Sequence, residues 1–134
     1  MPHTKAPPKP AAVAKLALDL LRESIYPQVG KLGVEPDQWG TLIDLMVIQF
    51  ALVLGQADGK LMSATKVSQY LGLPRTTVIR KLNQMLDAGV VEKMPGNRYR
   101  LAQEYLHSKL FDETFKRKAR HINRTACLLS KTDT

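Results

Sequence analysis

The sequence is poor in the residues on which catalytic sites, metal sites and disulfide bonds depend. It has a single cysteine, Cys127, so no disulfide can form within the chain, and no signal peptide precedes the folded part. None of its three histidines has a neighbouring Cys, Asp or Glu at metal-ligand spacing, and the sequence contains neither a glycine-rich phosphate loop nor a nucleophile elbow. We therefore expect a cytoplasmic protein that is not an enzyme and has no catalytic residue, cofactor or metal ion.

Also missing is an apolar run of the roughly twenty residues that cross a bilayer. The longest such run, Leu42 to Leu54, spans about thirteen residues and contains Asp44 and Gln49. We expect it to be a buried helix, with no membrane as partner. Aromatic residues make up only 6% of the chain, so the core must consist mainly of Leu, Val, Ile, Met and Ala. A chain of 134 residues suits one compact domain.

Acidic residues are fewer than basic residues in only one part of the chain. Residues 1–62 carry six basic and six acidic side chains, whereas residues 63–134 carry fourteen basic and six acidic ones. The whole net charge of +8 therefore belongs to the second part. Such a concentration of positive charge indicates a polyanionic partner.

The chain before this basic part predicts an arm and two helices. Residues 1–10 contain four prolines and predict a disordered arm, which we expect to be an idle tail rather than a segment that enters a DNA minor groove. Within residues 11–62, a first amphipathic helix is expected over Ala11–Tyr26, ended by Pro27, and a connector then leads to a second helix that begins near Pro36. That second helix is apolar around much of its circumference, which predicts burial on several sides.

Residues 63–101 predict a short helix, a tight turn, a longer helix and a β-hairpin. Ser63 is a good N-cap for a first helix over Ala64–Leu71. The second helix runs to about Ala88, and Pro95-Gly96-Asn97 has the chemistry of a hairpin turn. With long helices before and after it, this region predicts a mainly α fold, namely a winged helix-turn-helix with a three-helix core, a β-hairpin wing and flanking N- and C-terminal helices.

The outward face of the second helix is polar and cationic, as a helix that enters the major groove of DNA must be. We expect Arg75, Thr76 and Arg80 to contact base edges, because Arg pairs with guanine and Thr can meet the thymine methyl. Further candidate DNA contacts on the same helix are Thr77, Lys81 and Gln84. At the start of the preceding helix we expect Ser63, Thr65 and Lys66 to lie near phosphates. On one face of the hairpin the candidates are Arg98 and Arg100.

The run from Met62 to Ala102 resembles the winged helix-turn-helix of bacterial transcriptional regulators. LPRTTVIRKL and VVEKMPGNRYRLA are similar to the recognition helix and wing of the IclR family, whereas the layout, with long helices on both sides, resembles the MarR family of dimeric repressors. The resemblance implies a sequence-specific regulator, a repressor, that binds double-stranded DNA. IclR regulators carry a large C-terminal ligand domain, whereas this sequence continues for 33 residues after Leu101. MarR wings are usually longer and contain an Asp-x-Arg element, whereas this hairpin has Pro95-Gly96-Asn97-Arg98, so we carry over no ligand specificity from either family.

The flanking helices are too apolar to be buried by one small domain alone. Residues 11–62 and 102–130 therefore predict a homodimer, with an unknown small-molecule effector between the helices as the alternative. A winged helix that serves as a protein-interaction module is the main alternative to DNA binding, although such modules tend to lose the basic residues that this helix keeps. RNA binding is less favoured, because no aromatic stacking platform accompanies the basic face. Cys127 is expected to be an ordinary helix residue, with a redox sensor as the alternative.

Overall fold

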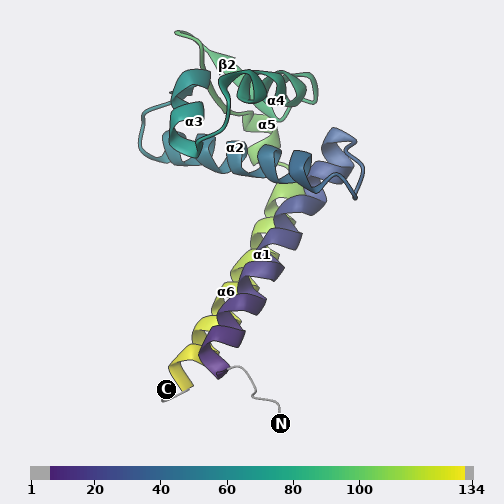
Figure 1. Cartoon of the computed structure of the whole chain (residues 1–134), viewed down its shortest axis with the longest axis vertical. Helices are drawn as coiled ribbons and strands as arrows, with labels where there is room; N and C mark the ends of the chain where they lie inside the picture. The colour runs from purple at the N-terminus through teal and green to yellow at the C-terminus, as the bar shows by residue number, and fades with distance from the viewer. Residues whose placement is uncertain (1–6, 132–134) are drawn as a thin grey trace.

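The computed structural model describes residues 7–131. Within them the protein is mainly α and 74% helical, as the sequence predicts, and it has a small antiparallel sheet of three strands (Figure 1). The middle of the chain forms a compact head, and the two terminal helices form a straight arm that projects from it (Figure 1). The order of elements in the head is compatible with a winged-helix layout.

The head consists of three helices packed with the sheet. In chain order these elements are α2 (Trp39–Ala57), β1 (Met62–Ser63), α3 (Ala64–Leu71), α4 (Arg75–Asp87), β2 (Val91–Met94) and β3 (Arg98–Leu101). The strand order is β1-β3-β2, and Tyr99 of β3 pairs with Met62 on one side and Lys93 on the other. The predicted helix over Ala64–Leu71 is confirmed as α3, whereas the two-residue strand β1 was not predicted.

The core of the head is aliphatic and centres on α2. Leu42, Leu45, Ile48 and Leu52 of this helix are completely buried, against α1, α3, α4 and β3. Among the described helices, α2 is the one that is long and apolar enough to cross a membrane, judged by length and composition. The prediction of a helix buried on several sides is confirmed for these residues, although the Phe50 side of α2 remains exposed.

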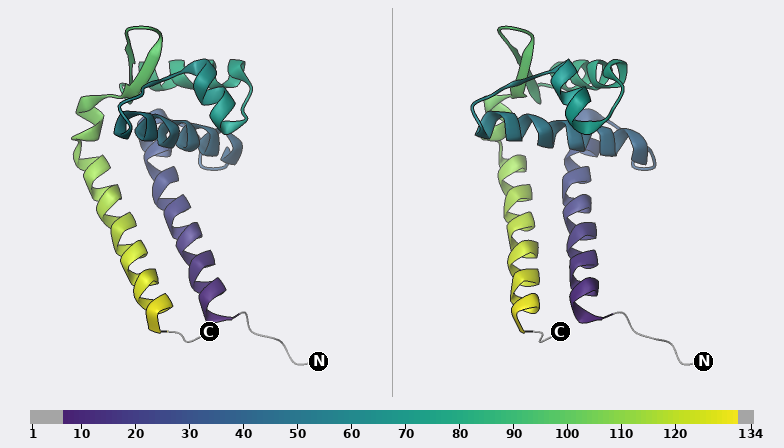
Figure 2. Two further views of the ribbon diagram at one scale, coloured as in Figure 1. Left: turned by 90° about the vertical axis from the view of Figure 1, so that its left-hand side faces the viewer. Right: turned by 60° about the vertical axis from the view of Figure 1, so that its left-hand side comes forward.

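The arm consists of α1 (Pro8–Leu32) and α6 (Lys109–Lys131), which run antiparallel and lie side by side in both views of Figure 2. The short helix α5 (Gln103–Leu106) connects β3 to α6 at the junction between the head and the arm. Both ends of the described chain therefore lie at the far end of the arm, away from the sheet (Figure 2).

The limits of α1 differ from the predicted Ala11–Tyr26. The helix already begins at Pro8, which falls within the predicted arm, because residues in the first turn need no donor N–H for the helix ladder. It also continues through Pro27, which is buried, and ends only at Gly33 in the left-handed conformation. The predicted connector is therefore mostly helical. Of the predicted disordered arm, residues 1–6 lie outside the described residues.

The predicted closing helix is interrupted once. Ser108 lies between α5 and α6, where its hydroxyl donates to the Tyr105 carbonyl at 2.6 Å and accepts from the Phe111 N–H at 3.2 Å. This serine both closes α5 and caps the first turn of α6. The break allows the chain to leave the head and enter the arm.

Candidate nucleic-acid interface

Hydrogen bonds fix both the start of α3 and the turn that leads from α3 to α4. The Ser63 hydroxyl accepts from the Lys66 N–H at 3.1 Å and caps the start of α3. Gly72 ends α3 in the left-handed conformation, with a φ of 73°. The Ser68 hydroxyl then donates to the carbonyl oxygen of Leu73 at 2.6 Å. These contacts set the direction in which α4 leaves the turn.

α4 has an apolar inner face and a polar outer face. Val78, Leu82 and Met85 are completely buried and attach the helix to the core. The predicted base contacts Arg75, Thr76 and Arg80 are exposed. The less central candidates Thr77 and Gln84 are half-buried at the margins of the outer face.

Lys81 does not belong to the outer face, and the prediction that it does is wrong. Only 7% of its surface is exposed, because it follows Val78 by three residues and precedes Met85 by four, on the packed side of the helix. Burial lowers the pKa of its ammonium group, and repulsion from Arg80 lowers it further, while attraction by Asp44 of α2 opposes both effects. Lys81 is therefore not available to a ligand on the outer face.

Arg75 connects the first residues of the two helices. Its Nε donates to the hydroxyl oxygen of Thr65 at 2.9 Å. Both residues, with Ser63, line a hollow of about 550 Å³ between α4 and the β2–β3 hairpin. The structure therefore brings predicted phosphate contacts and a predicted base contact onto one surface.

The hairpin formed by β2 and β3, here called the wing, has a tight turn. Three residues connect Met94 to its strand partner Arg98, and two of them, Gly96 and Asn97, are left-handed, with φ of 81° and 55°. Beyond this turn Arg98 is exposed, whereas Tyr99 and Leu101 point inward and are buried. The predicted alternation along β3 is therefore confirmed.

Arg100 is less accessible than Arg98. Its Nε donates to Glu92 Oε2 at 3.0 Å, and its side chain is 30% exposed. The other oxygen of Glu92 accepts from the Gln103 N–H at 3.2 Å. Arg100 is thus part of a contact between the two strands of the wing and the start of α5, which leaves Arg98 as the more accessible arginine of the wing.

Three residues of this surface were missed by the sequence prediction. Asn83 and Lys93 line the hollow between α4 and the wing, and Lys60 lines a second hollow of about 510 Å³ with Lys66 and Arg98. Asn83 follows Arg80 by three residues, so helical spacing was a signal for it. Lys93 shares a strand face with buried Val91, so alternation along β2 alone predicts that Lys93 is buried too. It is exposed instead, because the wing extends beyond the core at this point, and its Nζ lies 6.0 Å from the centre of the Tyr99 ring.

The surface is strongly cationic. Residues 63–101 carry seven basic and two acidic side chains. Lys81 is buried and Arg100 is paired, but the other five are exposed, and within residues 7–131 none of them forms an ion pair with a carboxylate: Lys66, Arg75, Arg80, Lys93 and Arg98. Unneutralised positive charges on two helices and a hairpin suit a ligand with regularly spaced negative charges.

A separate cavity of about 150 Å³ lies at the junction of the head and the arm. Its walls come from α1, α2, β3, α5 and α6, and include Phe50, Tyr105 and Lys118. Lys118 Nζ lies 5.1 Å from the centre of the Phe50 ring, and burial lowers the pKa of this lysine. The volume is comparable to that of cavities that admit one benzene-sized molecule. The small-molecule effector itself stays a prediction.

No protein-family model, curated protein or solved structure matches this chain. The interpretation of the cationic surface therefore depends on its geometry and charge, and the resemblance of the sequence to the two regulator families stays a resemblance.

Proposed function

We propose that the protein is a sequence-specific regulator of transcription that binds double-stranded DNA as a homodimer, with residues 63–101 as its winged helix-turn-helix. One observation carries this proposal: α4 exposes Arg75, Thr76 and Arg80 on a single face, between further exposed cations of α3 and the wing that no carboxylate neutralises within the described chain. A helix with such a face has the width and polarity that the major groove accepts.

In the proposed complex each element has its own part. The first turns of α4 lie in the major groove, where Arg75 and Arg80 donate to guanine and Thr76 contacts a base edge. Lys66 and the hydroxyls at the start of α3 contact phosphates and fix the register of the protein on the duplex. Arg98 at the wing follows the backbone or enters a narrow minor groove beside the site.

The biological setting follows from the resemblance to bacterial regulators rather than from the surface. The MarR-like layout favours a repressor that acts in the cytoplasm by occupying its operator. A protein-interaction module remains the competing proposal, and the two make opposite predictions for the exposed cations: a module needs no long polyanion, whereas a DNA reader binds more weakly as salt is added.

The experiment that tests the proposal is selection of bound sequences from random duplex DNA by the full-length protein. We expect a defined motif to be enriched, arranged as an inverted repeat, with an affinity for it at least about a thousandfold above that for unrelated duplex. Absence of any enriched motif, together with no dependence of binding on salt between about 50 and 200 mM, would rule out the DNA proposal.

A further inference from the structure

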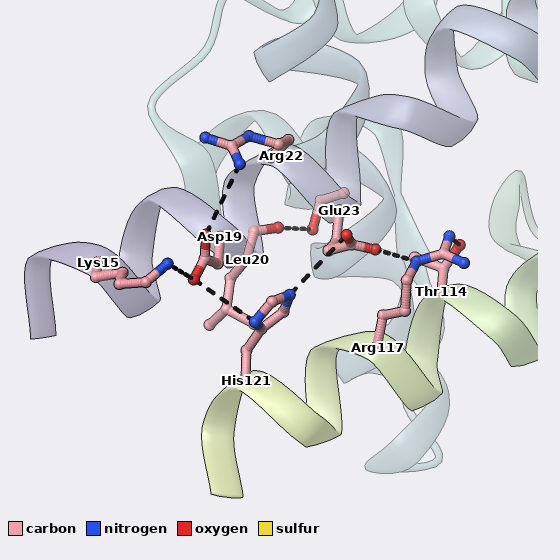
Figure 3. A network of polar contacts seen from close by, with 9 residues as sticks. Lys15, Asp19, Leu20, Arg22, Glu23, Thr114, Arg117 and His121 are labelled. Atoms are coloured by element: carbon pink, nitrogen blue, oxygen red, sulfur yellow. Dashed lines mark hydrogen bonds and ion pairs between the residues drawn. The ribbon is translucent and has the colours of Figure 1, made fainter. Parts of the chain in front are cut away.

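The two helices of the arm meet along a polar seam (Figure 3). On α1, Asp19 accepts from Lys15 Nζ at 3.0 Å and lies 3.5 Å from Nδ1 of His121 on α6. One turn further, Glu23 accepts from Arg117 of α6, and Arg117 also donates to the Thr114 hydroxyl at 3.5 Å. Thr114 and Thr125 of α6 are buried along the same line. Charged and hydroxyl groups of both helices therefore meet at this contact between α1 and α6.

A seam of this kind fixes how two helices align but adds little stability. Ion pairs at partly exposed positions contribute about 0 to 1 kcal/mol each, and paired charges that lose water gain little over apolar packing. Two helices that meet only in this way still need apolar burial to remain folded together. That burial must involve another face of the arm.

Apolar residues of both arm helices gather on one side of this seam. They form a groove of about 490 Å³, here called the arm groove, whose lining is almost entirely apolar. The lining comes from both arm helices and, near the head, from α2: Ala17, Leu20, Leu21, Ser24, Met46, Phe50, Phe115, Lys118, Ala119 and Ile122. Phe115 is 63% exposed and Ile122 is 47% exposed. On α1 the same face continues to Val13, which precedes Ala17 by four residues and is 50% exposed.

We propose that the arm groove is the surface through which two copies of this chain associate, so that two α1–α6 hairpins form a four-helix bundle around a twofold axis. The inference rests on the proposed function in one respect, since it assigns the homodimer of that proposal to a defined surface. With the twofold axis along the arm, both heads lie at the same end of the bundle and can contact one duplex.

Self-complementarity of the groove favours a second copy as its occupant. The small side chains of Ala17, Ser24 and Ala119 leave a hollow, and the large, exposed side chains of Phe115 and Ile122 lie beside it. A twofold axis brings the large residues of each copy to the small residues of the other, which is the requirement for an interface in which both partners use the same patch. The arm helices together carry eleven basic and four acidic side chains, but Lys118 is the one charged residue in the groove lining, so the groove is the part of the arm where two copies can come into close contact.

The size of the face is also appropriate. α6 has 23 residues and is about 35 Å long, and two adjacent helices are about 20 Å wide, so one face of the arm covers about 700 Å². Stable dimers bury about 800 Å² on each partner, and here the exposed flank of α2 near Phe50 adds to the arm face. The arm alone thus supplies most of the area that a stable dimer needs.

The test compares substitutions at two aliphatic residues of α6 that are equally exposed but lie on different faces of the helix. Ile122 and Leu128 are 47% and 48% exposed, and Ile122 lines the groove whereas Leu128 does not. We expect Ile122→Asp to convert the dimer to a monomer at about 10 µM in sedimentation velocity, while Leu128→Asp remains a dimer. Ala17→Asp, on the α1 side of the groove, should behave like Ile122→Asp, with the helical circular dichroism of all three variants close to that of the wild type.

Two results would overturn the inference. One is a wild-type protein that is monomeric at about 10 µM, and the other is a Leu128→Asp variant that dissociates as readily as Ile122→Asp. If Ile122→Asp fails to fold, Ala17→Asp and dilution of the wild type still decide. A monomer that binds the selected DNA motif contradicts this inference and the homodimer of the proposed function but leaves DNA binding intact, whereas a dimer that binds no DNA contradicts DNA binding and leaves this inference intact.

Discussion

Arg80 and Lys81 are neighbours on α4 with the same charge and opposite environments. Arg80 is exposed on the outer face, whereas Lys81 is 7% exposed and its pKa is lowered by burial. Removal of either charge changes the net charge of the protein equally. Any difference between the two variants in DNA binding must therefore come from position, not from net charge.

Arg80→Ala is predicted to weaken binding to the selected motif by about tenfold to a hundredfold and to reduce discrimination against a scrambled duplex, because a base contact is worth about 1–3 kcal/mol. Lys81→Met should change DNA affinity less than about twofold. It should also raise the melting temperature slightly, since a buried ammonium group is replaced by an apolar side chain of similar length. Fluorescence anisotropy and thermal melts measure both effects. Equal losses of affinity in the two variants would contradict the assigned outer face.

Lys66 is predicted to act on affinity without acting on specificity. It is exposed at the start of α3, next to the Ser63 cap, where a phosphate contact carries no sequence information. Lys66→Ala should weaken binding to the selected motif and to a scrambled duplex by the same factor. The slope of log affinity against log salt concentration should flatten by about one. A loss confined to the selected motif would instead make Lys66 a base contact.

For single residues of the head, the sequence predicts which ones are buried better than it predicts which ones are exposed. Val78, Leu82 and Met85 follow from helical spacing, since a buried stripe needs only one periodic pattern. Lys81 lies at the margin of that stripe, and α2, which is distant in sequence, determines that it is covered. The ion pair of Arg100 with Glu92 depends on strand register, which composition and spacing along one strand do not give.

The two helices of the arm are joined by ion pairs, and Asp19 is a carboxylate in these pairs whose pKa is lowered. The charged groups that face it are Lys15 and Arg22 of α1 and His121 of α6. The hydrogen bond from Lys15 lowers the pKa of Asp19 below 3.8, burial opposes this, and the nearby positive charges lower it further. Because the folded pKa is below the unfolded one, ionised Asp19 stabilises the protein above about pH 4, and this contribution is lost as pH falls through the folded pKa.

Asp19→Asn is therefore predicted to lower the melting temperature at neutral pH and to make it less dependent on pH in the acidic range. Once the pH is below the folded pKa of Asp19, the wild type and the variant should melt at nearly the same temperature, because the wild-type carboxyl is then protonated too. Thermal melts followed by circular dichroism at several pH values give the comparison. A constant difference in melting temperature at every pH would show that ionisation of Asp19 does not stabilise the arm.

The limits of the elements were predictable where the signal was local. The Ser63 cap and the glycine after α3 define that helix from neighbouring residues alone. Pro27 gave the wrong end for α1, because packing around it offsets the missing hydrogen bond and no local pattern shows that packing. Likewise, periodic spacing predicts that the first helix is amphipathic, and Leu20 and Leu21 of its apolar face line the arm groove. Which helix covers that face was not in the sequence, and the structure shows that α6 meets α1 largely through polar groups instead.

In the whole molecule, the head supplies the cationic surface and the arm supplies the apolar one. The arm also carries basic residues, since seven of the fourteen in residues 63–134 lie beyond residue 101, but the lining of its groove is almost entirely apolar. A surface that binds DNA must remain cationic and hydrated, whereas a surface that joins two copies must lose water. A long arm keeps the two surfaces apart and lets one rigid bundle set the distance between two heads.

That fixed distance gives the last prediction. Two heads held by one bundle contact half-sites about 34–36 Å apart, or a multiple of this, on one face of the duplex. Insertion of about 5 bp between the half-sites rotates one of them to the opposite face of the duplex, so the affinity of the wild type should fall at least about tenfold. Insertion of about 10 bp restores the face but increases the distance between the half-sites. It should be tolerated better than the insertion of about 5 bp only if the arm can change the distance between the two heads. The monomeric Ile122→Asp variant is the matched control, since each head then binds independently and spacing has no effect. Anisotropy titrations on the set of duplexes decide, and a wild type that is indifferent to the 5 bp insertion would mean that the arm does not couple the two heads rigidly.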